Sequence, residues 1–186
     1  TIGYVGRLVE AKGIDDLLGA ARRLDFPFRL LIVGGGPLRE RLEGAELGRG
    51  ELKLHAGVPS ENVVEEMPKL YGEMDLFVID SGTTETWAEQ FGRVLCEALL
   101  CGTPVIGSSS GEIPWVIETS GGGLVFPEGD AGALADALRE LHADPSRRAR
   151  LAERGREGVE RHFSARVAAR ERDRLLRDAL GRASAA

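Results

Sequence analysis

Short apolar runs alternate with longer amphipathic stretches over roughly the first 142 residues. The runs are apolar at successive positions, which is typical of parallel strands buried on both faces. They lie at 1–5, 28–34, 52–56, 75–79, 104–107 and 122–126. Between them, helical spacing and flanking Gly, Pro, Asp or Ser predict helices at about 13–24, 37–47, 62–72, 92–101, 112–119 and 130–142. This alternation predicts an α/β fold, a doubly wound parallel sheet of about six strands with helices on both faces.

The end of the chain follows another pattern. From Asp144 onward the sequence predicts two helices that meet at about residues 162–164, with Ser164 as the N-cap of the second. Apolar residues recur there at helical spacing: Leu151, Val159, Phe163, Val167, Leu175, Leu176 and Leu180. We therefore divide the chain into 1–143 and 144–186, and expect the C-terminal helices to pack across the sheet or onto a partner domain.

Composition and charge exclude several classes of protein. Hydrophobic residues make up 42% and charged residues 29%, as in ordinary globular proteins, and no apolar run approaches the ~20 residues that span a bilayer. The net charge is −6, yet residues 146–186 carry 12 basic and 6 acidic side chains. Because acids alternate with the arginines there, we interpret this segment as a solvated helix surface and expect no nucleic-acid partner.

The two cysteines and the chain start suggest a cellular context. Cys96 and Cys101 stand five apart on one predicted helix, so they point to different faces and predict buried thiols without a disulfide. That fits a reducing cytoplasm. The chain opens TIGYVG, which reads as a strand without a signal peptide or initiator Met, so we expect a domain of a longer protein.

Candidate chemistry begins after the first strand. In open α/β sheets ligands bind beyond the carboxyl ends of the strands. The segment GRLVEAKG (6–13) places Arg7 and Lys12 between Gly6 and a helix, and such cations commonly hold phosphates, although two solvated loop cations would look the same. The dinucleotide fingerprint GxGxxG is absent, which disfavours a nicotinamide dehydrogenase.

After the second strand, GGGP (34–37) predicts a tight turn or a close backbone approach.

The third strand is followed by HAGVPSENV (55–63). His55 lacks the Ser and Asp pattern of a catalytic base, so we interpret it as a core or edge residue. A planar base could lie against this loop and bond to the backbone near Val58.

The loop after the fourth strand is long and ends at a helix. It reads DSGTTETWAEQ (80–90), and the helix opens at Gly92, so amides of about Gly92–Val94 form an anion site at the positive end of the helix dipole. One turn further, Glu97 can accept hydrogen bonds from a vicinal diol such as a ribose. Glu89 in the loop is free to reach a second ring of hydroxyls, although either acid alone would also suit the helix dipole. Together these features describe a site for a nucleoside diphosphate that carries a sugar.

Five linked motifs, over about residues 1–142, resemble the C-terminal donor-binding domain of retaining glycosyltransferases of the GT-B fold, in the large family-four group. They are GRLVEAKG (6–13), LLIVGGGP (30–37), the E-x7-E element in 89–107, SGEIPWVI (110–117) and GLVFPEGDAGALADAL (123–138). The resemblance implies a Rossmann-like fold, retention of anomeric configuration and no metal or other cofactor. It also implies an N-terminal domain that binds the acceptor, a sugar or a lipid, and leaves open an association of the full-length protein with the inner face of the membrane.

The resemblance also implies roles for individual residues. Arg7 and Lys12 would hold the donor diphosphate and stabilise the departing charge, and Glu89 would contact the sugar hydroxyls. Glu97 would bind the ribose. The remaining donor contacts would come from Gly6, the backbone near Val58, Phe91, Gly92, Arg93 and Val94.

Two positions depart from the family pattern. Asp80-Ser81 stands well upstream of Glu89, where many relatives have Pro-Ser two or three residues before the acid, and the longer loop makes Trp87 a candidate to cover the sugar. Glu112 stands where many relatives carry a second Gly, beside the expected sugar site.

We expect the chain to be the donor-binding half of a retaining glycosyltransferase and to be inactive alone. Two alternatives remain open. A sugar-nucleotide epimerase can share this architecture, and a non-catalytic module could retain the nucleotide site.

Overall fold

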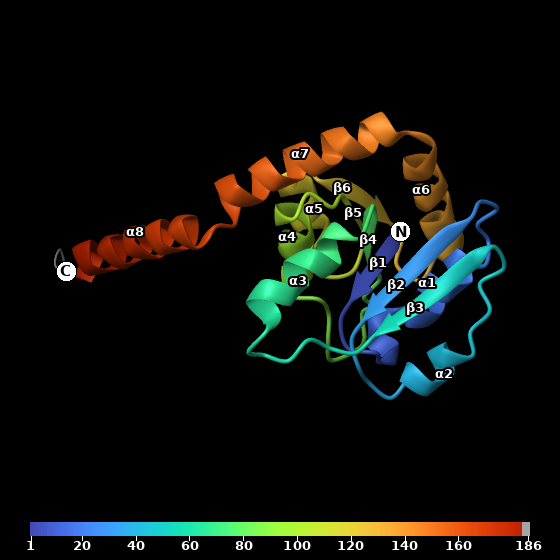
Figure 1. Ribbon diagram of the computed structural model, residues 1–186. Coiled ribbons are helices and arrows are strands. Elements are labelled where there is room, and N and C mark those ends of the chain that lie inside the picture. The colour runs from blue at the N-terminus through green and yellow to red at the C-terminus, as the bar shows by residue number, and fades with distance from the viewer. Residues whose placement is uncertain (184–186) are drawn as a thin grey trace.

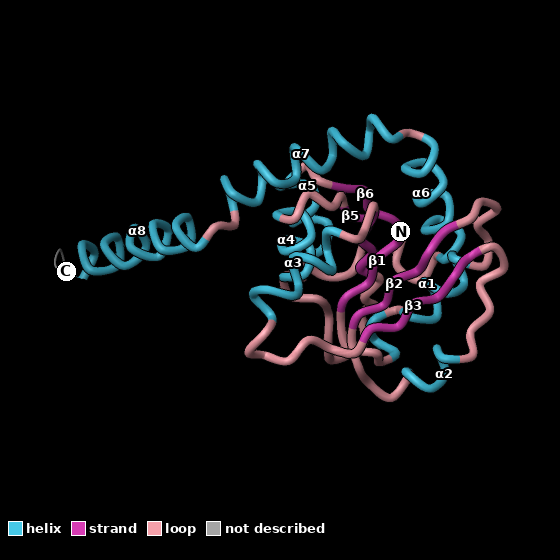
Figure 2. Tube along the Cα trace, viewed as in Figure 1, coloured by secondary structure: helices cyan, strands magenta, loops and turns pink. Residues whose placement is uncertain are grey.

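The computed structural model describes residues 1–183, without the side chains of 178, 179 and 181–183. One parallel sheet forms its centre, with helices around it (Figures 1 and 2). The strands are β1 (Ile2–Val5), β2 (Phe28–Val33), β3 (Gly50–His55), β4 (Leu76–Ile79), β5 (Val105–Ser108) and β6 (Gly123–Phe126). Their order is β3-β2-β1-β4-β5-β6, the Rossmann order that reverses between β1 and β4. The predicted fold class is confirmed.

The chain has helices between the strands and after the last strand, β6. They are η1 (Glu10–Lys12), α1 (Ile14–Ala21), α2 (Arg39–Glu43), α3 (Val63–Gly72), α4 (Arg93–Leu100), α5 (Ile113–Ser120), α6 (Ala131–Ala143), α7 (Pro145–His162) and α8 (Ala165–Ala183). Each connection from one parallel strand to the next needs such a crossover.

Alternate residues of the strands enter two separate cores. In β2, Leu30 and Ile32 pack into the core that α1 and α6 cover, whereas Leu31 and Val33 pack into the core under α3, α4 and α5. All four side chains are at most 2% exposed. Burial of such a side chain contributes about 1.5–3 kcal/mol, so strands apolar at every position are stable only when both faces are covered. This explains the continuous apolar runs in the sequence.

Helix α7 packs across the domain. Its N-cap Asp144 accepts a hydrogen bond from the Arg147 amide at 2.8 Å, and Leu151 and Val159 are buried. A Cβ at Gly158 would lie 2.2 Å from the Ser120 carbonyl oxygen, so α7 lies directly against the end of α5.

Helix α8 extends away from the rest of the molecule (Figure 1). The Ser164 hydroxyl accepts a hydrogen bond from the Val167 amide at 3.4 Å, as predicted for an N-cap. Leu175 and Leu176 are 55% and 57% exposed. Within the described residues α7 packs on the domain, and packing of α8 onto a partner domain stays a prediction. The last predicted residues, 184–186, lie outside the described part.

Some local predictions were wrong. The helix expected at 37–47 is only the short α2, because the chain leaves the helix at Gly44 and turns so that Leu47 is buried. Cys96 and Cys101 are free as expected, but half-buried rather than buried. His55 lies at the end of the edge strand β3, in line with the edge alternative. Within residues 1–183, no helix combines the length and apolar character needed to cross a membrane.

Candidate functional site

A cavity of about 300 Å³ lies at the carboxyl ends of β1 and β4, where the strand order reverses. This is the position at which open α/β sheets bind ligands. Its lining is Tyr4, Val5, Gly6, Arg7, Lys12, Ile79, Glu89, Gly92, Arg93, Val94 and Glu97. The structure thus brings together all the residues expected to contact the donor except Val58 and Phe91, while Trp87 and Glu112 also lie outside the lining.

The two remaining residues lie elsewhere. Val58 lines a neighbouring, mostly apolar hollow of about 320 Å³, which shares Val5, Gly6 and Arg7 with the first cavity. Phe91 turns away from the cavity, because its ring packs edge-on against Phe163 with centroids 5.5 Å apart. Phe91 therefore stabilises the start of α4 and does not line the site.

Close backbone contacts join the segment after β1 to the segment after β2. The Gly6 amide donates to the Val33 carbonyl at 3.0 Å, and the Leu8 amide donates to the Gly35 carbonyl at 2.9 Å. A Cβ at Gly34 would lie 1.9 Å from the Gly6 carbonyl oxygen. The GGGP motif thus permits a close approach to the segment that carries Arg7.

The Lys12 ammonium has partners from the loop after β4. It donates to Glu89 Oε2 at 2.5 Å and to Ser81 Oγ at 3.4 Å, and it lies 4.5 Å from the centre of the Trp87 ring. Gly13 makes this geometry possible, because its φ is +66° and a Cβ there would lie 1.7 Å from the Asp80 carbonyl oxygen.

Glu89 is held as a carboxylate. Burial alone would raise the pKa of Glu89, but hydrogen bonds from Lys12, from the Ser81 hydroxyl at 2.9 Å and from the Gly92 amide together lower it. The Glu89 main chain is fixed too, since its carbonyl accepts from the Glu112 amide at 2.9 Å and lies against Gly111. Glu89 is therefore an ordered ion-pair partner of Lys12, not the free loop acid that the sequence suggested.

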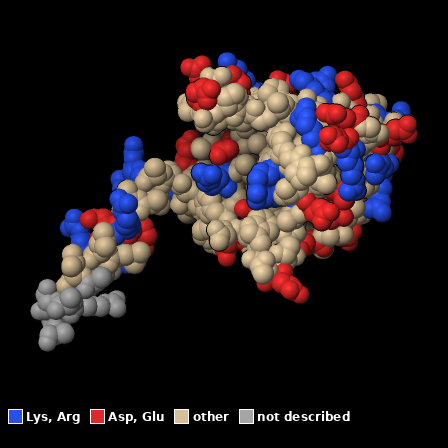
Figure 3. Space-filling model, turned by 90° about the horizontal axis from the view of Figure 1, so that it is seen from below, with Lys and Arg blue, Asp and Glu red and all other residues tan. Residues whose placement is uncertain are grey.

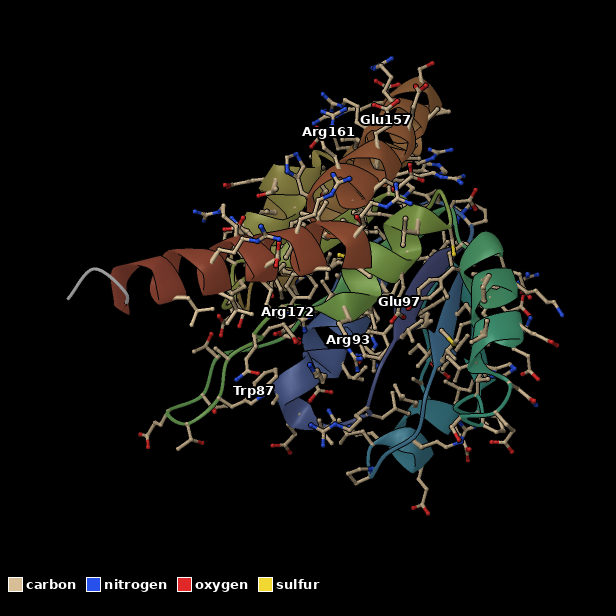
Figure 4. The ribbon with its side chains drawn as sticks, turned by 90° about the vertical axis from the view of Figure 1, so that its left-hand side faces the viewer. Trp87, Arg93, Glu97, Glu157, Arg161 and Arg172 are labelled. Atoms are coloured by element: carbon tan, nitrogen blue, oxygen red, sulfur yellow. The ribbon has the colours of Figure 1, made fainter. Side chains whose placement is uncertain are left out.

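Helix α4 begins at the cavity. Gly92 is its N-cap with φ +65°, a conformation that side chains rarely adopt, and Arg93 and Glu97 stand one turn apart on the same helix (Figure 4). Glu97 Oε2 accepts a hydrogen bond from the Tyr71 hydroxyl at 2.9 Å. Burial, and then the Glu97 charge, raise the pKa of Tyr71. The Tyr71 hydroxyl therefore stays protonated and donates to Glu97.

The sequence did not reveal the residues that anchor the loop 80–90. The Thr83 amide and hydroxyl both donate to the Glu128 carboxylate, and the Thr83 hydroxyl lies 2.8 Å from Ser110 Oγ. The buried Ser108 hydroxyl donates to the Ser81 carbonyl at 2.7 Å. Glu112, an unusual acid in its motif, has an exposed side chain and contributes its backbone amide.

The edge that bears the site is electrostatically mixed. Figure 3 looks onto this side of the molecule and shows basic groups around a hollow, with acidic groups nearby. In residues 1–183, no three His, Cys, Asp or Glu side chains are clustered as a metal site would require.

The fold and the position of the cavity define a Rossmann-like domain of the GT-B type. A family model described as "Glycosyl transferases group 1" matches residues 1–158, and the chain belongs to this family. A curated relative is the lipopolysaccharide core biosynthesis glycosyltransferase LpsE of Rhizobium meliloti, 33% identical over 162 residues. The match covers 86% of this chain and 44% of that protein.

Solved structures agree with this assignment. Sucrose-phosphate synthase from Thermosynechococcus elongatus superposes with a TM-score of 0.79 at 31% identity, over 97% of this chain and 45% of that one. Anabaena HepE in complex with UDP-glucose gives a TM-score of 0.79 at 22% identity, over 95% and 48%, and supports the fold alone. The chain spans less than half the length of these relatives, consistent with the C-terminal half of a GT-B protein.

Proposed function

We propose that this chain is the donor-binding half of a retaining glycosyltransferase and binds a nucleoside diphosphate sugar. The observation that carries the proposal is the cavity at the reversal of the strand order, which Arg7, Lys12, Arg93 and Glu97 line together with the start of α4. HepE, which has the same fold, is solved with UDP-glucose, so this fold can accommodate a nucleotide sugar.

The donor would lie along the two hollows. The base would occupy the apolar hollow at Val58, and the ribose hydroxyls would bond to Glu97, whose carboxylate Tyr71 orients. The diphosphate would lie between Arg7, Lys12 and the first amides of α4, where both the cations and the helix dipole favour negative charge. The sugar would then point toward Glu89.

Bond cleavage at the sugar leaves negative charge on the diphosphate oxygens. Lys12 is held near that position before the reaction by Glu89 and Ser81, and Arg7 lines the same cavity, so both cations would stabilise the developing charge. We propose that these side-chain cations carry the charge stabilisation and that no metal takes part. Lys12 must then share or exchange its Glu89 partner when the donor binds.

The acceptor would come from another part of the protein. The relatives are about twice as long as this chain, and α8 carries the apolar side chains Leu175 and Leu176 on its surface. We propose that residues 1–143 form the donor domain and that α8 packs on an acceptor domain, which binds a sugar or a lipid. The free thiols Cys96 and Cys101 are compatible with the cytoplasm, and contact with its membrane face is part of the proposal.

Calorimetry with UDP-, GDP- and ADP-sugars tests the donor site. We expect one nucleotide class to bind at millimolar concentration or below, and Lys12→Met to weaken binding roughly tenfold or more, as for a lost charge-assisted bond. Lys53→Met is the matched control, because Lys53 is an exposed lysine on β3 paired with Glu73. A folded chain that binds none of the three would contradict the proposal. An epimerase would convert the sugar nucleotide without an acceptor, which product analysis on the full-length protein distinguishes.

A further inference from the structure

The Lys12 ammonium is surrounded by three groups from one short segment. Glu89 lies 2.5 Å away, Ser81 3.4 Å away, and the Trp87 ring centre 4.5 Å away. The Lys12 and Glu89 side chains are 18% and 14% exposed, so the ion pair is largely shielded from solvent. Trp87, like Ser81, is absent from the cavity lining, and the family motifs give it no role.

The position of Trp87 is fixed by its backbone. The Thr84 amide and hydroxyl donate to the Trp87 carbonyl at 2.7 and 3.3 Å, which closes a tight turn. The hydroxyl of the preceding Thr83 donates a hydrogen bond to the Glu128 carboxylate. Figure 4 shows Trp87 on this loop, next to the segment that carries η1 and α1. These bonds order the main chain at Trp87, and the half-buried indole lies against the Lys12 ammonium.

A tryptophan face attracts an ammonium through the ring quadrupole. The attraction matters for lysine, because its four-carbon stem is flexible and loses up to about 2 kcal/mol of rotamer entropy when it is fixed. Glu89 also fixes Lys12, but only until a diphosphate competes for the same ammonium. The indole bears no charge and does not compete, so it can hold Lys12 both before and after the donor binds.

We propose that Trp87 is a positioning residue for Lys12, which holds the ammonium at the diphosphate position while its partner changes from Glu89 to phosphate. This inference rests on the proposed donor site. Trp87 acts through Lys12, since it does not line the cavity and its ring lies against the lysine. The extended loop 80–90 then supports the Lys12 ammonium from one side.

The test compares UDP, GDP and ADP binding by calorimetry for four chains: wild type, Trp87→Leu, Trp87→Phe and Trp115→Leu. Trp87→Leu keeps apolar bulk and removes the aromatic face, so we expect roughly 5- to 10-fold weaker binding of whichever diphosphate the wild type binds. Trp87→Phe keeps an aromatic face and should stay within about twofold. Trp115→Leu is the matched control, because Trp115 is 51% exposed and packs on Phe163. Equal melting temperatures establish that all four chains are folded.

A double-mutant cycle separates positioning from general support of the loop. In a Lys12→Met background, measured at millimolar ligand, Trp87→Leu should change the dissociation constant by less than about twofold, because the group it holds is gone. An equal loss in both backgrounds, or no loss in the wild-type background, overturns the inference and leaves the donor site intact. A wild-type chain that binds none of the three nucleotides overturns the donor site and this inference with it.

Discussion

Asp80 provides a prediction that depends only on the fold. It follows β4 directly, is 2% exposed, and its Oδ2 atom is a buried oxygen without a hydrogen-bond partner in the described part of the chain. Burial, and then the charges of Asp16 and Glu128, raise the pKa of Asp80 to about 8 from 3.8. Asp80 is thus largely a neutral acid at pH 7 in the folded chain and a carboxylate in the unfolded chain.

The sign of the pH dependence follows from this difference. Between about pH 4 and 8 the folded chain binds one more proton at Asp80 than the unfolded chain, so the stability that this group contributes is complete below pH 4 and lost as the pH rises to 8. The slope approaches about 1.4 kcal/mol per pH unit, and the whole change is on the order of 5 kcal/mol. Asp80→Asn has nearly the same shape and cannot ionise, so this pH dependence should disappear in the variant.

Urea unfolding followed by circular dichroism at pH 5, 6, 7 and 8 measures the effect. The free energy of unfolding of Asp80→Asn minus that of the wild type should increase steadily over this range. Asp136→Asn is the control, because Asp136 is an exposed carboxylate paired with Arg139, and it should not reproduce the trend. A difference that stays constant from pH 5 to 8 would show that Asp80 ionises normally, and the reasoning from its burial would be refuted.

Three other substitutions test the packing and the site. Gly13→Ala forces a left-handed φ and a backbone clash, so it should cost more than about 1–2 kcal/mol of stability, whereas Gly44→Ala, with open space around it, should cost little in the same melts. Gly158→Ala should lower the melting temperature by several degrees, because its Cβ would meet the Ser120 carbonyl. Glu97→Gln should weaken nucleoside diphosphate binding roughly tenfold in calorimetry, with unchanged stability.

Each of these has an outcome that would contradict it. A Gly13→Ala chain as stable as Gly44→Ala would mean that the loop carrying Lys12 relaxes freely. An unchanged melting point for Gly158→Ala would mean that α7 is not packed as described. Equal affinity of Glu97→Gln and the wild type would remove Glu97 from the proposed ribose contact.

The sheet could be predicted because its signal is local. Successive apolar residues such as Leu30, Leu31 and Ile32 require burial on both faces, and only parallel strands covered by helices on both sides provide it. The carboxyl ends of parallel strands lie at one edge of the sheet. The sequence alone therefore places Arg7 and Lys12 near the start of α4.

The contacts within the site could not be predicted in the same way. The Lys12–Glu89 pair joins residues 77 apart in the sequence, and the Tyr71–Glu97 bond joins residues 26 apart. No periodicity encodes such pairs, because they depend on loop paths that backbone contacts at Gly13 and Gly111 determine. The sequence alone suggests Trp87 as a cover for the sugar, whereas in the structure its ring lies against Lys12.

The two C-terminal helices share a helical pattern of apolar residues but differ in burial. Both α7 and α8 carry apolar residues at helical spacing, yet Val159 is 2% exposed and Leu176 is 57% exposed. The sequence pattern predicts an amphipathic helix but does not specify its partner. For α8 that partner is not found among the described residues of this chain.

A crystal structure of the chain with the nucleotide sugar that binds in calorimetry tests the central claim most directly. We predict density for the diphosphate within hydrogen-bond distance of Arg7, Lys12 and the first amides of α4, with the ribose at Glu97. A nucleotide found instead at the opposite edge of the sheet, in the hollow of about 230 Å³ beside Phe26 and His142, would contradict the account.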